Sequence, residues 1–392
     1  MPLTASRITI NAPHQQSGMV HWEGELSTPS GEQHRIYFEF SIPDDRPYLP
    51  HSRPFLLAFL VPAMGTGTPL ELNLPIDAVT LNNLMEWQEA MVSWFPQTLK
   101  VIPIHAPTDT SPEALGRPSA LTAFSGGVDS NFTARRHTQA SNPPMFRATQ
   151  LQAGLMVHGF DILLNQPTVF ESALARSRTM LEAFGLKTYY MRTNLRSLEK
   201  VPGCDWEKNS HGIWLAATLA CYEPWFGQIL IPSTYSYPML RFPWGSNPIT
   251  DPLFSSATTT YWHDGAAFRK LAKIQAIASV PAVQQHIRVC WEGEQLDRNC
   301  GKCFKCIATQ ICFQLSGVDH PAAFPVPCTV EEIALLPVKT PQNEWLLRSM
   351  CNEAQRQEKY HIAQALNHAI ARAKIKPPFR GIKRWALDFN SK

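Results

Sequence analysis

The chain has 392 residues, 44% of them hydrophobic, which is enough for two or three domains with separate cores. Its 35 lysines and arginines nearly balance 32 aspartates and glutamates, so the net charge of +3 neither requires nor excludes a nucleic-acid partner. No apolar run reaches the roughly 18 residues of a membrane span. The first residues also lack the pattern of a secretory signal, so we expect a cytoplasmic protein with no membrane partner.

Residues 1–112 predict a β-rich N-terminal domain. Polar and apolar residues alternate over 7–10, 19–26 and 35–40, which is the pattern of half-buried strands. One helix is expected near 81–95, where large apolar side chains fall on one face. Residues 111–118 contain two prolines and a glycine and predict a linker.

Residues 113–318 predict a second domain in which strands and helices alternate. Strands are expected at 121–124, 152–162, 188–192 and 228–231, and helices at 130–137, 169–184 and 211–222. This alternation predicts an α/β fold with a doubly wound parallel sheet, covered by helices on both faces. Ligands of such sheets bind beyond the carboxyl ends of the strands.

A glycine-bearing hexapeptide follows the first of these strands, and it consists of Ser125, Gly126, Gly127, Val128, Asp129 and Ser130. Adjacent glycines allow positive φ and bring successive N–H groups close to an anion. The N-terminus of the next helix adds donors, and Asp129 is a suitable ligand for Mg²⁺. No Walker A string occurs in the chain. The pattern predicts a phosphate site, and the alternative is a tight turn between strand and helix.

Four cysteines lie close together in the sequence, namely Cys290, Cys300, Cys303 and Cys306. Their spacing suits a tetrahedral site for a soft metal, and four thiolates would close the coordination shell of Zn²⁺, which makes the metal structural. Cysteines this close cannot all form disulfides without strain. The other five cysteines are scattered, as expected of buried thiols in a reducing compartment.

The hexapeptide resembles the pyrophosphate-binding loop of the ATP pyrophosphatase superfamily, also called PP-loop or adenine nucleotide α-hydrolase enzymes. With the cysteine spacing, about residues 118–315 resemble the 7-cyano-7-deazaguanine synthase (QueC-like) family. The resemblance implies a sheet of the HUP/PP-loop type and an ATP-dependent ligase. Such a ligase adenylates a carboxyl-type substrate with Mg²⁺, releases pyrophosphate and AMP, and forms a C–N bond. It also introduces an alternative metal group, since sulfur-inserting members of the superfamily carry an iron–sulfur cluster.

The resemblance implies roles for individual residues. The amides near Gly126, Gly127 and Val128 would hold the phosphates, with Mg²⁺ on Asp129. Lys273 stands where the synthase carries a lysine before its metal loop, and Arg269 is expected one helical turn earlier on the same face. These two cations are candidates for the α-phosphate, and the alternative for each is a surface charge.

Three further residues are candidates for substrate binding at the sheet rim. His158 and Asp161 are expected at the end of the second strand of the α/β region, and Asp251 lies in a loop rich in glycine and proline. Ordinary turn or cap roles are the alternatives. Residues 233–238 and 244–252 depart from the synthase signature, so the carboxylated substrate need not be a deazapurine, and a protein acceptor or partner stays open.

Residues 319–392 predict a helical C-terminal extension with helices at 342–355 and 359–374, followed by a basic tail. Two other functions remain open. One is sulfur transfer to tRNA or a small molecule, and the other is a non-catalytic nucleotide-binding partner protein.

Overall fold

A mixed β-sheet runs through the first part of the chain. The structure, a computed structural model, describes residues 4–44, 48–109, 118–138, 149–240 and 242–372. The chain divides into two compact units, Met1–Arg269 and Lys270–Lys392. Residues 111–117 of the expected linker, the expected boundary at 112/113 and the basic tail lie outside the described residues. The three-domain division therefore stays a prediction.

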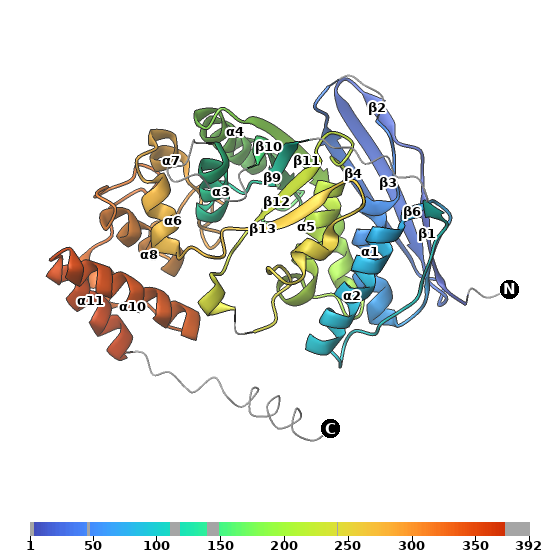
Figure 1. Cartoon of the computed structure of the whole chain (residues 1–392). Helices are drawn as coiled ribbons and strands as arrows, with labels where there is room; N and C mark the ends of the chain where they lie inside the picture. Colours follow the sequence, from blue (N-terminus) through green and yellow to red (C-terminus); the bar gives the residue numbers. More distant parts are fainter. Residues whose placement is uncertain (1–3, 45–47, 110–117, 139–148, 241, 373–392) are drawn as a thin grey trace. The chain divides into compact units, whose positions relative to one another are not determined.

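The sheet of the first unit has the strand order β13-β12-β9-β10-β11-β4-β3-β1-β5-β7, with β2 paired to β3 (Figure 1). Its strands are β1 (Ser6–Ile10), β2 (His14–Gln16), β3 (Met19–Ser27), β4 (Gln33–Ser41), β5 (Leu70–Leu72), β7 (Ile104–His105), β9 (Ser119–Ala123), β10 (Gln150–His158), β11 (Lys187–Thr193), β12 (Gln228–Pro232) and β13 (Thr260–Asp264). Strands β6 (Ile76–Asp77) and β8 (Thr108–Asp109) form a separate pair.

The predicted fold class, a doubly wound parallel sheet of the HUP/PP-loop type beside a separate β-rich domain, is wrong. Strands β1, β3, β4 and β11 are joined by antiparallel pairing, so the sheet is mixed. The junction is at β11, where Met191 pairs with Phe40 of β4, and the N-terminal strands thereby continue one long sheet. The alternation of polar and apolar residues identified these strands, but it does not show which neighbouring strand each of them pairs with.

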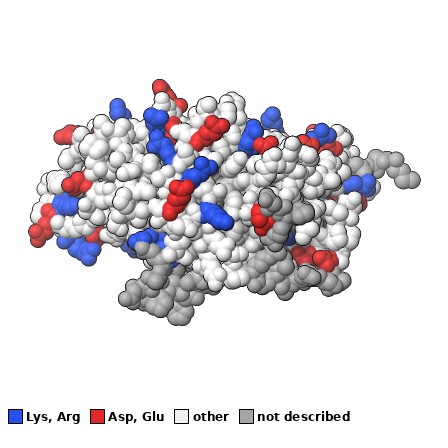
Figure 2. All heavy atoms as spheres, turned by 90° about the horizontal axis from the view of Figure 1, so that it is seen from above, with Lys and Arg blue, Asp and Glu red and all other residues white. Residues whose placement is uncertain are grey.

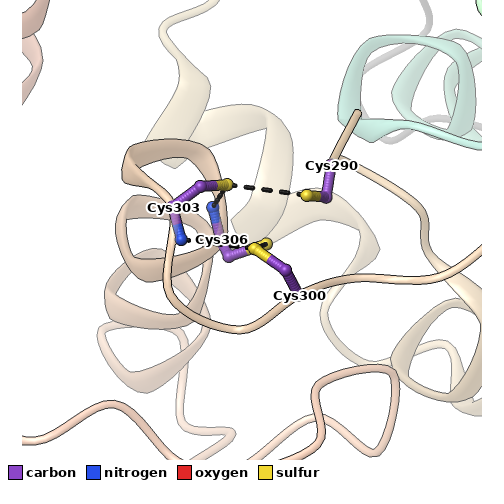
Figure 3. Close-up of side chains that lie close together, drawn as sticks. All are labelled: Cys290, Cys300, Cys303 and Cys306. Atoms are coloured by element: carbon purple, nitrogen blue, oxygen red, sulfur yellow. Dashed lines mark hydrogen bonds between the residues drawn. The ribbon is translucent and has the colours of Figure 1, made fainter. Parts of the chain in front are cut away.

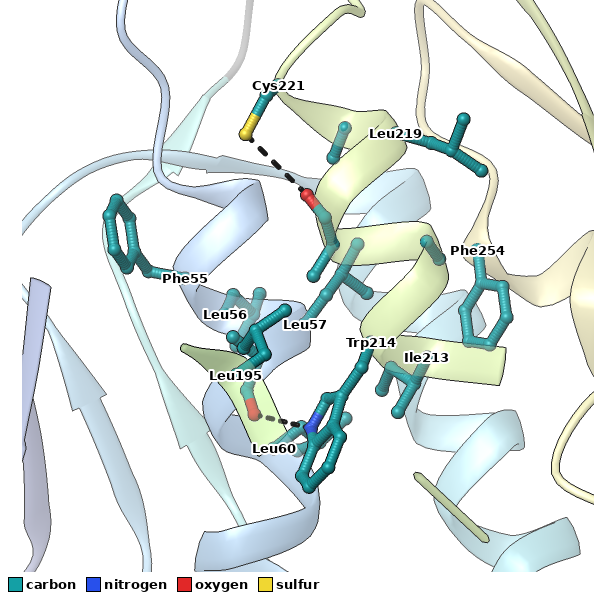
Figure 4. Close-up of a cluster of buried hydrophobic side chains, with 14 of the residues drawn as sticks. Phe55, Leu56, Leu57, Leu60, Leu195, Ile213, Trp214, Leu219, Cys221 and Phe254 are labelled. Carbon is teal, nitrogen blue, oxygen red and sulfur yellow. Dashed lines mark hydrogen bonds between the residues drawn. The ribbon is translucent and has the colours of Figure 1, made fainter. Parts of the chain in front are cut away.

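Alternate residues of the sheet face different helices. On β10, Gly154 lies against Leu181 of α4 (Pro167–Ala183), whereas Leu155 belongs to the core that includes α1 (Arg53–Thr66) and α5 (His211–Ala220). Figure 4 shows α1 packed on α5 through Leu57, Leu60 and Trp214, whose indole N–H donates to the Ala58 carbonyl at 3.0 Å. Helix α2 (Ala78–Trp94) completes the N-terminal region close to the expected 81–95.

A buried ion pair ties α1 to the end of α5. The Glu223 carboxylate accepts from Arg53 Nε at 2.9 Å and from the Tyr261 hydroxyl at 2.9 Å, and both charged residues are 6% exposed. Burial alone would lower the pKa of Arg53, but the charges of Glu223 and Tyr261 and the hydrogen bond to Glu223 together outweigh it, so the pKa is raised. The N-terminal region and the parallel strands thus share one polar network as well as one core.

Replacing Glu223 by glutamine is expected to lower the free energy of unfolding by about 3–5 kcal/mol, since it leaves the buried Arg53 charge uncompensated. Urea denaturation measures the loss. The matched control is Glu71→Gln, which removes an exposed pair with Arg7 (3.1 Å) and should cost less than about 1 kcal/mol. Equal losses in the two variants would show that burial of the Glu223 pair is energetically irrelevant.

Five strands in the sheet, β11-β10-β9-β12-β13, run parallel and end on the same edge. The loops that follow them therefore meet at one rim. From β9 the chain proceeds to β10 on one side and later returns to β12 on the other, so the strand order reverses next to β9. In open sheets the crevice at such a reversal is the usual position of a ligand.

The second unit is helical around the cysteine loop. Its helices are α6 (Lys270–Ile277), α7 (Pro281–His286), α8 (Phe304–Gln314), α9 (Val330–Ala334), α10 (Pro341–Arg356) and α11 (Tyr360–Arg372). Thr329 and Glu332 form a capping box at the start of α9, and Thr340 caps α10. Among the helices of the described ranges, none combines the length and apolarity needed to cross a bilayer.

Candidate phosphate site and four-cysteine site

The hexapeptide 125–130 lies at the carboxyl end of β9 and leads directly into α3 (Val128–Thr138). Gly126 has φ +76°, the left-handed region that favours glycine. A Cβ atom there would also stand 3.2 Å from Ser177 Oγ and 3.3 Å from Met180 Cε of α4. The backbone conformation therefore favours glycine at this turn, and the space beside it is tight.

Side chains of α3 hydrogen-bond to backbone carbonyls of the loop. The Asn131 amide nitrogen donates to the Gly126 carbonyl at 3.1 Å and to the Gly127 carbonyl at 2.8 Å, and Ser130 Oγ donates to the Gly127 carbonyl at 3.2 Å. The first backbone hydrogen bond of α3 runs from Asn131 N to Gly127 O at 3.2 Å. The amides before Asn131 therefore have no acceptor within the helix. Ser125 is exposed and Asp129 is half-buried. This arrangement can offer N–H donors, hydroxyls and one carboxylate to a phosphate with its metal ion.

The same helix is anchored to the end of β13. The Asp264 carboxylate accepts from Thr133 Oγ1 at 2.8 Å, Arg136 Nη1 at 2.7 Å and His137 Nε2 at 3.1 Å. Thr149 N donates to His137 Nδ1 at 3.4 Å, which leaves the proton of the imidazole on Nε2, facing Asp264. Burial would raise the pKa of Asp264, but the hydrogen bond from His137, the charge of Arg136 and the hydrogen bond from Thr133 together lower it below 3.8.

Replacing Asp264 by asparagine is expected to lower the free energy of unfolding by about 3 kcal/mol at neutral pH, because Arg136 and His137 lose their buried anion. The lowered pKa means that this stabilisation is complete above the ordinary value of 3.8 and is lost as pH falls through the folded value. The difference between wild type and Asp264→Asn in urea denaturation should therefore shrink below pH 3.8. A difference that grows in acid would contradict this assignment.

The rim residues expected from the sequence have different surroundings. His158 ends β10 as expected, where it is 1% exposed, donates from Nε2 to the Leu163 carbonyl at 2.8 Å and stacks on Phe170 at 4.4 Å. Burial lowers its pKa. Asp161, in the turn that this hydrogen bond closes, is exposed. The His158 imidazole thus has structural contacts in this turn, and Asp161 is the group there that a ligand can reach.

Asp251 is fully buried at the start of a short 3₁₀ helix, η4 (Asp251–Phe254). It accepts from Ser246 Oγ at 2.7 Å, from Asn247 N at 3.2 Å and from His263 Nδ1 at 2.6 Å. His263 and Asp264 were missed by the sequence reasoning because β13 was missed. The signal was present in the short apolar pair Tyr261 and Trp262 followed by His-Asp, at the position where a fifth strand would end.

The two candidate cations lie in different units. Arg269, expected one helical turn before Lys273 on the same face, ends the first unit immediately before α6 begins. Lys273 lies within α6 of the second unit and is 2% exposed. Their joint action at an α-phosphate stays a prediction.

The four cysteines converge in the second unit, as Figure 3 shows. Their sulfurs all lie within 4.8 Å of one another, with Cys303 to Cys290 at 3.7 Å and Cys300 to Cys306 at 3.9 Å. Four thiolates bound to one zinc ion at about 2.3 Å stand about 3.8 Å apart at the corners of a tetrahedron. The observed separations fit that geometry, so this cluster could bind one metal ion such as zinc. All nine cysteines are free thiols.

Local hydrogen bonds shape the cysteine loop. Cys303 N donates to Cys300 Sγ at 3.4 Å, and Cys306 N donates to Cys303 Sγ at 3.5 Å. Gly301, with φ +80°, makes the turn between the first two of these cysteines. A hydrogen bond from the Cys306 side chain lowers the pKa of Cys303 to about 5, so this thiol ionises readily. Asn299 fixes the loop by accepting from Val289 N at 2.9 Å.

Comparisons of the chain with protein-family models, with curated proteins and with solved structures found no match.

Proposed function

We propose that the loop 125–130 binds the phosphates of ATP and that the protein is an adenylating ligase. The observation that carries the proposal is a glycine turn at the carboxyl end of β9, with Gly126 at φ +76°, opening into the N-terminus of α3. It lies next to the reversal of strand order, where ligands of open sheets bind. The sequence resemblance to the ATP pyrophosphatases supplies the reaction.

Different residues of the loop bind different parts of the nucleotide. Amides at the start of α3 and the Ser125 hydroxyl bind the β- and γ-phosphates, while Ser130 supports the loop through its hydrogen bond to the Gly127 carbonyl. Asp129 binds the Mg²⁺ that neutralises the leaving pyrophosphate. A substrate carboxylate attacks the α-phosphorus, which gives an acyl adenylate and pyrophosphate. Ammonia or an amine then displaces AMP and forms the C–N bond.

We assign a structural zinc ion, rather than an iron–sulfur cluster, to the four cysteines. Sulfur separations of 3.7 and 3.9 Å suit a single ion, whereas a four-iron cluster sets its own iron and sulfide atoms between the thiolates and needs wider spacing. The closed shell would bind no water, so the zinc stabilises the loop 290–306 and takes no part in the reaction.

Sulfur transfer is less well supported. It requires a reactive thiol near the phosphate loop, and of the cysteines in the first unit Cys204 is half-buried and Cys221 is buried. Burial raises the pKa of Cys204 to about 12 and also raises that of Cys221, so neither readily forms a thiolate. In Figure 2, basic and acidic side chains intermix over the described part of the face shown, without the broad basic surface expected of a tRNA-binding enzyme.

Pyrophosphate release from Mg·ATP tests the proposal. The purified protein is mixed with carboxylated deazapurines or with the small-molecule and protein fractions of a cell extract. We expect pyrophosphate and AMP in equal amounts with at least one fraction. ATP binding without cleavage in every fraction would favour a non-catalytic nucleotide-binding partner instead, and the absence of ATP binding would exclude both functions.

A further inference from the structure

The carboxyl end of β13 carries a buried carboxylate–imidazole pair that ATP binding does not use. His263 Nδ1 lies 2.6 Å from Asp251 Oδ2, and the two side chains are 2% and 0% exposed. His263 Nε2 is also buried, and within the described part of the chain it has no hydrogen-bond partner. A buried polar atom without a partner in a polar site points to a ligand or an ordered water.

Asp251 fixes the tautomer of this histidine. A carboxylate only accepts hydrogen bonds, so the close contact places the imidazole proton on Nδ1 and leaves the lone pair of Nε2 free. Ser246 Oγ and Asn247 N also donate to Asp251, and these contacts hold the carboxylate in position. This is the arrangement by which a carboxylate orients a histidine as a proton acceptor.

The pair lies at the same rim as the phosphate loop. Asp264 faces α3 and Tyr261 faces α5, so His263 lies on the α5 side of the sheet. Strand β13 is two strands from β9, a distance of about 10 Å. The neighbouring loop contributes two more buried polar atoms without partners among the described residues, Trp244 Nε1 and Thr250 Oγ1. Both residues belong to the loop that carries Asp251, the partner of His263.

We propose that His263 Nε2 accepts the proton of an amine nucleophile, an inference that rests on the proposed function. The amine lone pair forms the new C–N bond to the acyl carbon of the adenylate. The bond from that carbon to the phosphate oxygen breaks, and its electron pair leaves on AMP. The proton lost by the nitrogen passes to His263 Nε2, and Asp251 stabilises the imidazolium that results.

Half-reactions separate this role from a structural one. In the extract fraction that supports turnover, His263→Gln should retain a burst of pyrophosphate but release AMP at least 100-fold more slowly, the usual contribution of a general base. Hydroxylamine, a strong nucleophile that is unprotonated at neutral pH, should restore most of the AMP release by trapping the acyl group. His263→Asn is the second variant should the glutamine form not fold, and thermal unfolding checks both.

The matched control is His34→Gln on β4, whose Nε2 is likewise buried without a hydrogen-bond partner, with Glu32 Oε2 3.7 Å away, but β4 is five strands from β13 in the sheet. It should turn over within threefold of the wild type. Nitrogen NMR of histidine-labelled wild type should show the Nδ1–H tautomer for the signal that His263→Gln removes. A proton on Nε2, or unchanged AMP release in His263→Gln as expected for a site that holds only water, would overturn the inference. If the wild type releases no pyrophosphate, the proposed function has failed, and the NMR result still decides the tautomer.

Discussion

Replacing Asp129 by asparagine is expected to reduce ATP-dependent pyrophosphate release by about 10²–10³-fold, the usual effect of removing one group that stabilises a charged transition state. The substitution conserves size but removes the charge that holds Mg²⁺ beside the leaving pyrophosphate. Asp129 is half-buried in the first turn of α3, so the fold should persist. Initial rates of pyrophosphate release over a range of Mg²⁺ concentrations measure the effect.

The control for Asp129 is Glu171→Gln, an exposed carboxylate on α4, which should keep the wild-type rate. If Asp129→Asn turned over normally with the same Mg²⁺ dependence, the metal would have to be held elsewhere. The role assigned to the first turn of α3 would then be wrong.

Replacing Cys306 by serine is expected to remove the metal and to unfold the second unit. Structural zinc contributes on the order of 10 kcal/mol to the folding of small zinc domains, which is comparable with the whole stability of an ordinary domain, about 5–15 kcal/mol. Cys306 is also fully buried at the start of α8, where few substitutions are tolerated. Elemental analysis should give about one zinc per wild-type chain and almost none in the variant.

Circular dichroism should show a matching loss of helix in Cys306→Ser, because the second unit is helical. Cys328→Ser, which changes a buried thiol outside the cluster, should keep the zinc and the helix signal. Iron with visible absorbance in the wild-type protein would establish a cluster and would contradict the assignment of zinc.

The sequence predicted individual elements well where a single periodicity dominates. The strands at 19–26 and 35–40 and the helix at 169–184 correspond to β3, β4 and α4 within a few residues. The overall sheet was predicted wrongly, because the edge pairing of β4 with β11 depends on contacts between residues some 150 positions apart, and no local pattern encodes it. Strand β13 was not predicted because it has only five residues, of which the last two, His263 and Asp264, are polar.

The candidate sites show a similar division. The cysteine cluster could be predicted from the sequence because its four ligands lie within 17 residues and are all cysteines, which favour soft metals. Asp251 was identified as a polar group in a rim loop, but its partner His263 could not be, since their contact joins a loop to a strand that was not expected. Pairs of this kind require the tertiary structure.

Calorimetric titration of a non-hydrolysable Mg·ATP analogue into the wild type and Gly126→Ala tests the phosphate loop most directly. A Cβ atom at position 126, where φ is +76°, raises the free energy of the native loop by about 1 kcal/mol or more and crowds Ser177 and Met180. We expect the loop to shift in response, which displaces its N–H donors. We predict saturable binding to the wild type and at least tenfold weaker binding to the folded variant. Equal affinity in the two proteins, or no binding to either, would contradict the account.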